Sequence, residues 1–460
     1  MFVKIIFSLL IFLFSVSLMA QNNLFDVYKN NPSYEVSFLK DSVVEIFDKK
    51  ENYKWRKKIT EYPAYKNTSE ANLIISLDTV NFNAYESYYK YWGTIPAVNS
   101  YGKYISVDAN KNNKNELYVS KLVRDDSLFL KSRIYEQTVN SVFNEIYVYP
   151  EPGAPFYDIG DITNDGLLDL VYLGYNARLI FVKQSYPNSL INEPNFIYNP
   201  FPRVYQFNDV TLYDIDRDGN QEIIYYLFAG DDSIWAYSNH IAKYNPQINN
   251  YELIYYHRPS PDWFTSGISI GDFDLDGKGN FATGSIDGKF YIYEYVQGTQ
   301  YQVEFTKELE TFNAFLTIMT DDMDGNGKPE IWIGGDFSSW TYGGVTRLFA
   351  FEATGTGSYE QVYQIDIRGL FSGIYGKLRY VDLDGDNKKE LFLTNASLVF
   401  GFKYDGKGNY YMDFVKALPI PDSTYFYYAL ERVDIADLDG DGIVEVIPQY
   451  ELSQYSQGPW

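Results

Sequence analysis

The sequence predicts an all-β protein, a β-propeller of seven blades with four antiparallel strands each, with eight blades as the alternative. Three observations predict it. An acidic motif recurs seven times, consecutive copies start 50 to 60 residues apart, and each copy is followed by short runs of β-forming residues without helical periodicity. Four short strands in a unit of this length, separated by turn residues, are typical of a propeller blade.

The composition excludes several classes of function. The chain has 460 residues, with 38 Lys and Arg against 61 Asp and Glu, so its formal net charge is −23. This balance argues against nucleic acid and anionic membrane surfaces as partners, since both are bound through clustered Lys and Arg. The sequence has no cysteine, which excludes disulfides, thiolate metal sites and cysteine nucleophiles. His240 and His257 are the only histidines, which leaves little room for histidine-based catalysis.

The N-terminal segment 1–20 has the order of a secretory signal peptide. Lys4 precedes an apolar run over residues 5–18, and the small residue Ala20 ends the segment. The alternative is a membrane anchor, but so short a run is marginal for crossing about 30 Å of hydrocarbon. We therefore expect export of residues 21–460 to the periplasm, the cell surface or the medium, with no transmembrane segment after cleavage.

The repeated motif has acidic or amide residues at its first, third, fifth and ninth positions, with Thr once at the third, and Gly or Asn at its sixth. Its seven copies begin at Asp108, Asp161, Asp214, Asp272, Asp322, Asp382 and Asp437. An alternating apolar stretch precedes each copy and further strand-like runs follow it. Around the third copy these runs are 210–216, 222–228, 231–238 and 251–257.

The repeats span residues 101–452, and we expect residues 21–460 to form one propeller domain. Residues 33–62 contain runs similar to the third and fourth strands of a repeat. They are expected to complete the blade begun by residues 425–452, which would close the ring by pairing N- and C-terminal strands. Residues 63–100 lack the motif and are interpreted as either an insertion or a degenerate extra blade.

The motif has the chemistry of a calcium site. Calcium takes about 6–8 oxygen ligands, and a tight loop with oxygen-bearing side chains at positions 1, 3, 5 and 9 directs them to one point. The sixth position must turn through positive φ, which Gly allows and Asn tolerates. The alternative, a set of solvated Asp/Gly turns, fits one isolated copy better than seven in register. The candidate ligands of structural Ca²⁺, several ions per chain, are Asp108, Asn110, Asn112, Glu116, Asp161, Thr163, Asp165, Asp169, Asp214, Asp216, Asp218, Glu222, Asp272, Asp274, Asp276, Asn280, Asp322, Asp324, Asn326, Glu330, Asp382, Asp384, Asp386, Glu390, Asp437, Asp439, Asp441 and Glu445.

The copies differ in charge. Those at Asp214, Asp382 and Asp437 carry four carboxylates each, whereas the copy at Asp108 carries two, Asp108 and Glu116. Because a low carboxylate count lowers calcium affinity, metal binding by the copy at Asp108 is left open.

With these residues the chain resembles the FG-GAP/VCBS repeat family, the calcium-binding blades of integrin-α-like β-propellers. The resemblance rests on the six sharper loops and on their Gly-Asp-Ile and Gly-Asp-Phe openings at Gly160 and Gly271, and it covers roughly residues 100–452. It implies that each calcium loop joins the first and second strands of a blade at one end of the ring, and that partners bind at the opposite end. The chain departs from the family pattern at Asn113, Asn387, Thr163 and Asn280, which lowers the affinity expected there.

Segments rich in aromatic residues and proline are expected at that opposite end. Aromatic faces suit sugars and extended peptides, so these segments predict a ligand platform. The alternative is that their side chains plug the mouth of the ring. The candidate ligand-binding residues are Tyr198, Phe201, Trp263, Trp340 and Tyr375, with Arg203 or Arg258 as polar anchors.

The sequence favours a secreted, monomeric calcium-binding propeller that acts as a non-catalytic binding or adhesion module for an extracellular protein or glycan. The alternative is a propeller-type polysaccharide lyase or glycosidase, which needs a general base or a carboxylate pair in a cleft. Nearly all patterned carboxylates are assigned to metal, and the sequence contains no G-x-S-x-G, H-E-x-x-H or phosphate-loop motif. We therefore predict that the protein is not an enzyme.

Overall fold

The computed structural model describes residues 34–38, 43–49, 53–58, 71–85, 92–93 and most of 105–454. Within 105–454 it leaves out residues 125–127, 140–141, 175–177, 201–205, 229–237, 258–264, 286–287, 298–299, 312, 315, 340–342, 370–376, 384–385, 387, 396–397, 418–424 and 440–443. The described residues belong to two compact units, Met1–Glu70 and Ala71–Trp460. The regular secondary structure of these residues is β-strand apart from the short 3-10 helix η1 (Phe82–Tyr85). No helix among them has the length and apolar character needed to cross a membrane.

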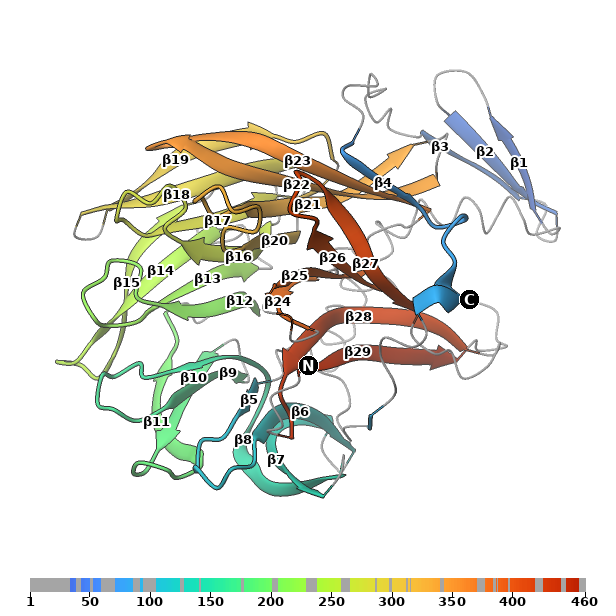
Figure 1. The fold of residues 1–460 in the computed structure, drawn as a ribbon. Helices are drawn as coiled ribbons and strands as arrows, with labels where there is room; N and C mark the ends of the chain where they lie inside the picture. Colours follow the sequence, from blue (N-terminus) through green and yellow to red (C-terminus); the bar gives the residue numbers. More distant parts are fainter. Residues whose placement is uncertain are drawn as a thin grey trace. The chain divides into compact units, whose positions relative to one another are not determined.

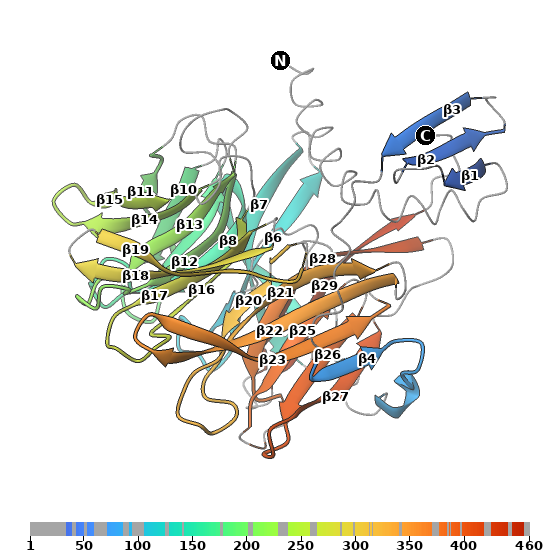
Figure 2. The same ribbon diagram turned by 90° about the horizontal axis from the view of Figure 1, so that it is seen from above.

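The unit Ala71–Trp460 is an all-β propeller whose sheets follow one another around a ring (Figures 1 and 2). Its strands form six blades of four consecutive antiparallel strands, numbered 1 to 6 in chain order, of which blades 1 and 2 share one strand and so make a seven-stranded sheet. Blades 1 and 2 comprise β5 (Ile105–Val107), β6 (Glu116–Arg124), β7 (Leu128–Val139), β8 (Val142–Gly160), β9 (Asp169–Gly174), β10 (Arg178–Gln184) and β11 (Ile191–Tyr198). Blade 3 comprises β12 (Gln206–Tyr213), β13 (Glu222–Phe228), β14 (Ser238–Asn245) and β15 (Asn250–His257). Blade 4 comprises β16 (Thr265–Gly271), β17 (Asn280–Ser285), β18 (Lys289–Gln297) and β19 (Gln300–Glu308).

The remaining strands complete the ring. Blade 5 comprises β20 (Leu316–Met319), β21 (Ile331–Ser339), β22 (Gly343–Gly355) and β23 (Ser358–Arg368). Blade 6 comprises β24 (Lys377–Val381), β25 (Glu390–Asn395), β26 (Leu398–Tyr404) and β27 (Tyr410–Ala417). The last sheet has two strands, β28 (Tyr425–Ala436) and β29 (Glu445–Gln454).

Strand β8 serves two blades because it is 19 residues long. Its first part pairs with β7, up to the pair Lys131 and Pro152, and its second part pairs with β9 from the pair Gly153 and Gly174 onward. A Cβ atom at Gly153 would lie 2.4 Å from the carbonyl oxygen of Leu173. Only glycine therefore permits the close backbone approach where β8 changes partner.

The core lies between the sheets. Seven clusters of buried apolar side chains each join two consecutive sheets, and one of them brings Leu438 and Ile447 of the last sheet against Leu117 and Tyr135 of blade 1. Strands buried on both faces read as continuous apolar runs, as β13 does, whereas the outer strand β19 is largely exposed and polar. The ring of sheets is thus held by side-chain packing between neighbours around its whole circumference.

The predicted number of complete blades is wrong. The described residues form six four-stranded blades, not seven or eight, and the seventh motif lies in the two-stranded sheet of β28 and β29. The motif specifies only the loop between the first two strands of a sheet. The number of motifs therefore gives the number of such loops and does not show whether a third and a fourth strand complete the blade.

The residues expected to close the ring form a sheet of their own. β1 (Tyr34–Phe38), β2 (Val43–Asp48) and β3 (Tyr53–Lys58) pair in sequence order within the unit Met1–Glu70, and closure by the two termini stays a prediction. Of residues 63–100, β4 (Leu73–Ser76) pairs in parallel with β23 and adds a fifth strand to blade 5. This described part of the segment is therefore an edge addition to an existing blade.

Candidate metal centres

All seven motifs lie at the same place in their sheets. Each connects the first strand to the second, from the loop between β5 and β6 in blade 1 to the loop between β28 and β29 in the last sheet. This confirms the position that the family resemblance implied for the loops. Two residues of the predicted ligand set, Asp384 and Asp441, lie outside the described residues, as does the sixth-position residue Asn387.

The ninth residue closes every loop in the same way. Its side-chain oxygen accepts a hydrogen bond from the backbone N–H of the second residue, which ties the start of strand two to the end of strand one. The seven bonds are Glu116 to Ala109 (2.7 Å), Asp169 to Ile162 (3.0 Å), Glu222 to Ile215 (3.1 Å), Asn280 to Phe273 (2.9 Å), Glu330 to Met323 (3.0 Å), Glu390 to Leu383 (2.7 Å) and Glu445 to Leu438 (2.7 Å). An amide oxygen does this as well as a carboxylate, so Asn280 preserves the loop although it lacks the charge.

The first residue of the motif shapes the turn. Asp214 accepts the backbone N–H of Asp218 at 3.0 Å and that of Gly219 at 2.9 Å, and Asp108 and Asp161 accept the equivalent pair of N–H groups in their own loops. These bonds occupy part of the lone-pair capacity of each carboxylate and hold the loop in shape by themselves.

In the five loops whose fourth and sixth positions are described, both positions have positive φ, not one. The sixth position does so as predicted, at Asn113, Gly166, Gly219, Gly277 and Gly327. The fourth position was missed: it has φ between 53° and 80° at Lys111, Asn164, Arg217, Leu275 and Gly325. Non-glycine residues in this region carry a steric cost, so the fold of the loop outweighs the preference of these side chains.

Carboxylates converge in five triads whose oxygen atoms lie within 4.8 Å of one another. Three come from the motif alone and two include residues of the third or fourth strand, Glu294, Glu304 and Glu352, which the sequence reasoning missed. The triads are Asp214–Asp216–Asp218, Asp272–Asp274–Asp276, Asp437–Asp439–Glu445, Asp274–Glu294–Glu304 and Asp324–Glu330–Glu352. No triad in the described part of the chain includes a residue of the loops that begin at Asp108 and Asp161.

One residue of the third strand sets the charge that faces each loop. The third-strand residue that faces the ninth position of the motif is lysine in blades 2, 3 and 6 and glutamate in blades 1, 4 and 5. In blades 1 to 4 the strand register pairs the two residues directly: Glu116 with Glu136, Asp169 with Lys183, Glu222 with Lys243, and Asn280 with Glu294. In blades 5 and 6 the register begins one residue later, at Ile331 with Phe351 and Leu391 with Phe402, and the carboxylate of Glu330 lies near that of Glu352 and that of Glu390 near the Lys403 ammonium group. No fixed spacing along the chain marks these residues, since the register of the hairpin sets the pairing and the hairpins differ in length.

Each of these lysines forms ion pairs with carboxylates of its own loop. Lys243 Nζ is held by three carboxylates and Lys403 Nζ by two. The distances from Nζ to oxygen are 2.5 Å to Asp216, 2.6 Å to Asp218 and 3.3 Å to Glu222 for Lys243, 3.0 Å to Asp386 and 2.8 Å to Glu390 for Lys403, and 3.0 Å to Asp165 for Lys183.

Burial governs the electrostatics of the ninth position. Removal from water raises the pKa of Glu116, Glu222 and Glu330 to about 7 and that of Asp169 to about 6. Burial also opposes the charged form of Lys243, but hydrogen bonds to the loop aspartates outweigh it and raise the pKa of the ammonium group. A nearby positive charge, from a lysine or from a bound cation, favours the charged form of these carboxylates.

Blades 4 and 5 have the donor sets that fit calcium, a hard cation bound by oxygen. In blade 4 the Oδ1 atom of Asp272 and the Oε2 atom of Glu294 are buried without a hydrogen-bond partner, which leaves acceptor capacity for a cation. Glu304 lies in a triad with Asp274 and Glu294, and burial raises the pKa of its carboxyl to about 7. In blade 5, Asp324 contributes to a comparable triad.

Few of the residues predicted for the ligand platform can be placed. Tyr198 is buried at the interface of blades 2 and 3, and its hydroxyl lies 2.9 Å from that of Tyr225, so it has no open face for a ligand. Phe201, Trp263, Trp340, Tyr375, Arg203 and Arg258 lie outside the described residues. The platform stays a prediction for those positions.

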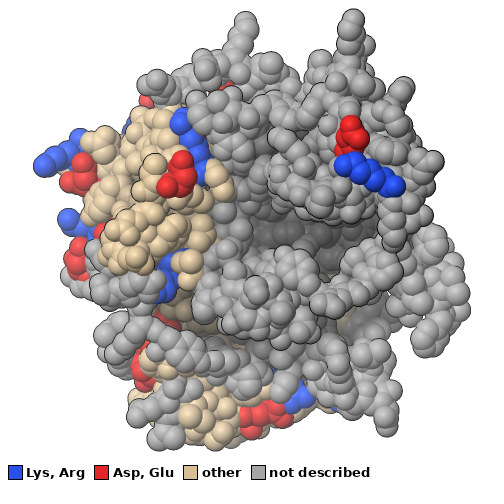
Figure 3. Space-filling model, turned by 90° about the vertical axis from the view of Figure 1, so that its right-hand side faces the viewer, with Lys and Arg blue, Asp and Glu red and all other residues tan. Residues whose placement is uncertain are grey.

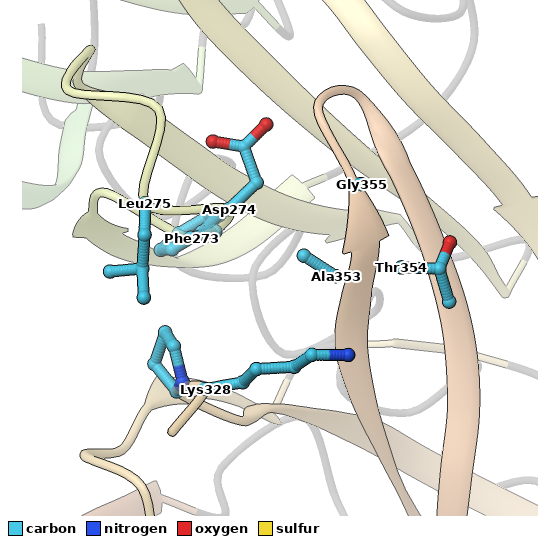
Figure 4. A pocket seen from close by; sticks show the side chains of 8 residues that line it. Phe273, Asp274, Leu275, Lys328, Ala353, Thr354 and Gly355 are labelled. Carbon is cyan, nitrogen blue, oxygen red and sulfur yellow. The ribbon is translucent and has the colours of Figure 1, made fainter. Parts of the chain in front are cut away.

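A small pocket lies between the loops of blades 4 and 5. Phe273, Asp274 and Leu275 come from one loop, Lys328 and Pro329 from the other, and Ala353, Thr354 and Gly355 from β22 (Figure 4). Its volume of about 160 Å³ is below the roughly 300–1,000 Å³ of small-molecule sites. The pocket is thus smaller than the sites that bind drug-sized ligands.

The described surface has both signs of charge. On the face drawn in Figure 3, described Lys and Arg side chains lie next to Asp and Glu side chains rather than in one field. Ion pairs such as Arg178 with Glu151 (3.1 Å) and Arg217 with Asp272 (2.9 Å) show the same mixture.

Residues 382–447 match the family model of the FG-GAP-like repeat. The match runs from the loop of blade 6 into β29 and confirms the FG-GAP resemblance over that segment. No curated protein matches the chain by sequence.

Among the solved structures with a similar fold are three that illustrate how distant the similarity is. BBS1N in complex with ARL6DN shares 13% identity and a TM-score of 0.44, over 76% of this chain and 93% of that one. The periplasmic gluconolactonase PpgL of Pseudomonas aeruginosa shares 10% identity and a TM-score of 0.44, over 84% and 96%. An Agrocybe aegerita lectin that recognises non-reducing terminal N-acetylglucosamine shares 14% identity and a TM-score of 0.37, over 69% and 80%. The function has to be argued from the loops themselves.

Proposed function

We propose that this protein is an exported, calcium-stabilised β-propeller that acts as a non-catalytic binding or adhesion module for an extracellular protein or glycan. One observation carries the proposal: the same acidic loop joins the first two strands of all seven sheets, and the segment with the last two loops matches the FG-GAP-like repeat. Export is proposed from the N-terminal segment 1–20, which lies outside the described residues.

Calcium would be structural in this proposal. Its double positive charge would neutralise carboxylates that are buried close together at the corner of a sheet. In blade 4 the residues that would hold it are Asp274, Glu294 and Glu304, and in blade 5 they include Glu330 and Glu352. The loops are already shaped by their own hydrogen bonds, so the ion would stabilise the packing of neighbouring blades rather than create the turn.

A binding role accords with how the carboxylates are used. In the described residues those that cluster are buried or bonded within the loops. His240 lies in the core, stacked on Tyr225 with 5.2 Å between ring centres, and His257 lies 2.9 Å from the hydroxyl of Tyr293. A rigid ring of packed sheets is a suitable support for ligand-binding loops, because loops carry recognition and the scaffold fixes them. We propose Phe201, Trp263, Trp340 and Tyr375 as the aromatic contacts for the partner.

The test joins metal binding to ligand binding. Metal-free residues 21–460 should bind several calcium ions by calorimetry, and their melting temperature should rise with calcium but not with equal magnesium. A glycan and extracellular-protein array probed in calcium should yield a ligand that the variant with Trp263→Ala and Trp340→Ala no longer binds, while its melting temperature is unchanged. A melting temperature that ignores calcium would contradict the metal role, and ligand binding unaffected by the two substitutions would contradict the platform.

A further inference from the structure

The seven loops share one frame but face different charges. Their ninth-position bond and their place in the sheet are the same, whereas the third-strand residue opposite the loop is lysine in blades 2, 3 and 6 and glutamate in blades 1, 4 and 5. The difference is therefore confined to the point at which the carboxylates of a loop would meet a cation.

In blade 3 the ammonium group of Lys243 lies at that point. It is within 3.3 Å of the carboxylates at the third, fifth and ninth positions of the motif, Asp216, Asp218 and Glu222. Two of its N–H donors form hydrogen bonds with Asp216 and Asp218, and Glu222 adds an ion pair at 3.3 Å. The first-position residue Asp214 is occupied by backbone N–H groups.

Blade 6 repeats the arrangement with a more deeply buried lysine. The Lys403 side chain is only 6% exposed, and its Nζ atom pairs with the fifth-position residue Asp386 and the ninth-position residue Glu390. In blade 2 Lys183 pairs with the fifth-position residue Asp165. A covalently attached charge in this position needs no ion from solution.

We propose that Lys183, Lys243 and Lys403 are built-in cations that replace the metal in the loops of blades 2, 3 and 6. Calcium is then taken only by loops without such a lysine. This inference rests on the proposed calcium binding. It reverses part of the expectation that loops with more carboxylates bind calcium more tightly. The loops at Asp214 and Asp382 have four carboxylates each, and they are now the loops that do not need the ion.

The glutamate blades show the opposite arrangement. Glu352 adds a carboxylate to the triad of blade 5, and Glu294 does so in blade 4. Blade 4 also has Lys278, which pairs with Asp276 and Glu294 at 2.9 Å, but this lysine belongs to the loop itself and is 40% exposed. It is the most exposed of these lysines, against 32%, 25% and 6% for the side chains of Lys183, Lys243 and Lys403, and it can swing into solvent with its loop when an ion enters.

The test is the calcium count of a lysine variant. Lys243→Met removes the ammonium group and leaves Asp214, Asp216, Asp218 and Glu222 together, so the variant should bind one calcium ion more than the wild-type chain. Lys243→Arg keeps the charge and should bind the wild-type number. Lys307→Met, at an exposed position of β19, is the control for loss of a surface lysine. Calcium is measured by elemental analysis and calorimetry on chains purified in calcium and then dialysed.

The outcomes separate this inference from the proposed function. A gain of one calcium ion by Lys243→Met, without a gain in Lys243→Arg, supports the lysine inference. This holds even if the wild-type chain binds no calcium. Absence of calcium from the wild-type chain would count only against the proposed calcium role. An unchanged count in Lys243→Met overturns the inference whatever the wild-type number is. If Lys243→Met does not fold, Lys243→Gln retains polar contacts and should give the same gain.

Discussion

Glu330 of blade 5 accepts a hydrogen bond from the hydroxyl group of Tyr410 of blade 6, with 2.9 Å between the two oxygen atoms. The other carboxylate oxygen of Glu330 accepts the N–H of Met323 at 3.0 Å and closes its own loop. The Glu330 side chain thus stabilises its own loop and also forms a hydrogen bond between two neighbouring blades. The acidic motif therefore contributes to the contact between blades as well as to the loop.

Replacing Tyr410 by Phe should therefore destabilise the protein by about 1–3 kcal/mol, because a buried carboxylate oxygen loses its partner. The adjacent Tyr411 is largely exposed, so Tyr411→Phe is a matched control and should leave the free energy of unfolding nearly unchanged. Urea denaturation of both variants measures the difference. Equal stabilities would show that the bond between blades contributes nothing.

The ninth-position bond predicts how a loop responds to substitution. Glu222→Gln keeps an oxygen that can accept the N–H of Ile215, as Asn280 does naturally for Phe273, so we expect a modest change in stability. Glu222→Ala leaves that N–H buried and unpaired and should cost about 1–3 kcal/mol more than the Gln variant. Thermal unfolding of the two variants compares them directly, and a Gln variant as unstable as the Ala variant would mean that charge, not the bond, maintains the loop.

The fourth position of the motif predicts a stabilising substitution. Leu275 is exposed and has a φ of 59°, whereas blade 5 has Gly325 at the same place. Leu275→Gly removes the steric cost of this conformation and should be more stable than Leu275→Ala by about 1 kcal/mol. The Ala variant is the control because it removes the same exposed side chain but keeps Cβ. A Gly variant less stable than the Ala variant would contradict strain at this position.

The sequence predicted the positions of the loops because the information there is local. The carboxylates at the first and ninth positions and the glycine at the sixth shape one turn, so their spacing is visible in the chain. The fourth position could not be predicted, since Lys111, Arg217 and Leu275 share no chemical feature and adopt positive φ only because the turn imposes it.

Lys243 and Glu294 could not be identified for a different reason. They reach the loops from the third strand, and only the pairing of the second and third strands shows that each faces a ninth-position residue. The length of the connecting hairpin varies from blade to blade, so the register is a property of the folded sheet. The sequence analysis therefore counted the charges of each loop but not the charge of the third-strand residue that faces it.

The buried carboxyls predict the pH dependence of stability in the presence of chelator. The pKa of Glu116 and Glu330 is about 7 in the folded state against 4.5 as the ordinary value, so between these values the folded chain holds protons that the unfolded chain releases. Stability should then fall as pH rises from about 5 to 7, the sign that linkage gives for a raised pKa. Carboxyls whose pKa is lowered in the folded state, such as those of Asp218 and Asp276, titrate below this pH range and do not affect the trend within it. Melting temperatures in chelator that rise over this range would contradict the prediction, and saturating calcium should weaken the trend.

The ion pair of Arg347 and Asp366 predicts a large loss from a single substitution. Arg347 on β22 donates two parallel hydrogen bonds of 2.7 Å to Asp366 on β23, and both side chains are buried. Asp366→Asn should cost about 3–5 kcal/mol because it removes the buried counter-charge of a buried guanidinium group and leaves it with the exposed carboxylate of Glu310 at 3.8 Å. In the exposed pair of Arg178 and Glu151, Glu151→Gln should cost less than about 1 kcal/mol. Denaturant unfolding of the two variants tests the contrast, and comparable small losses would mean that the burial of Arg347 is already compensated by other contacts, among them the carbonyl oxygen of Glu310 at 3.1 Å.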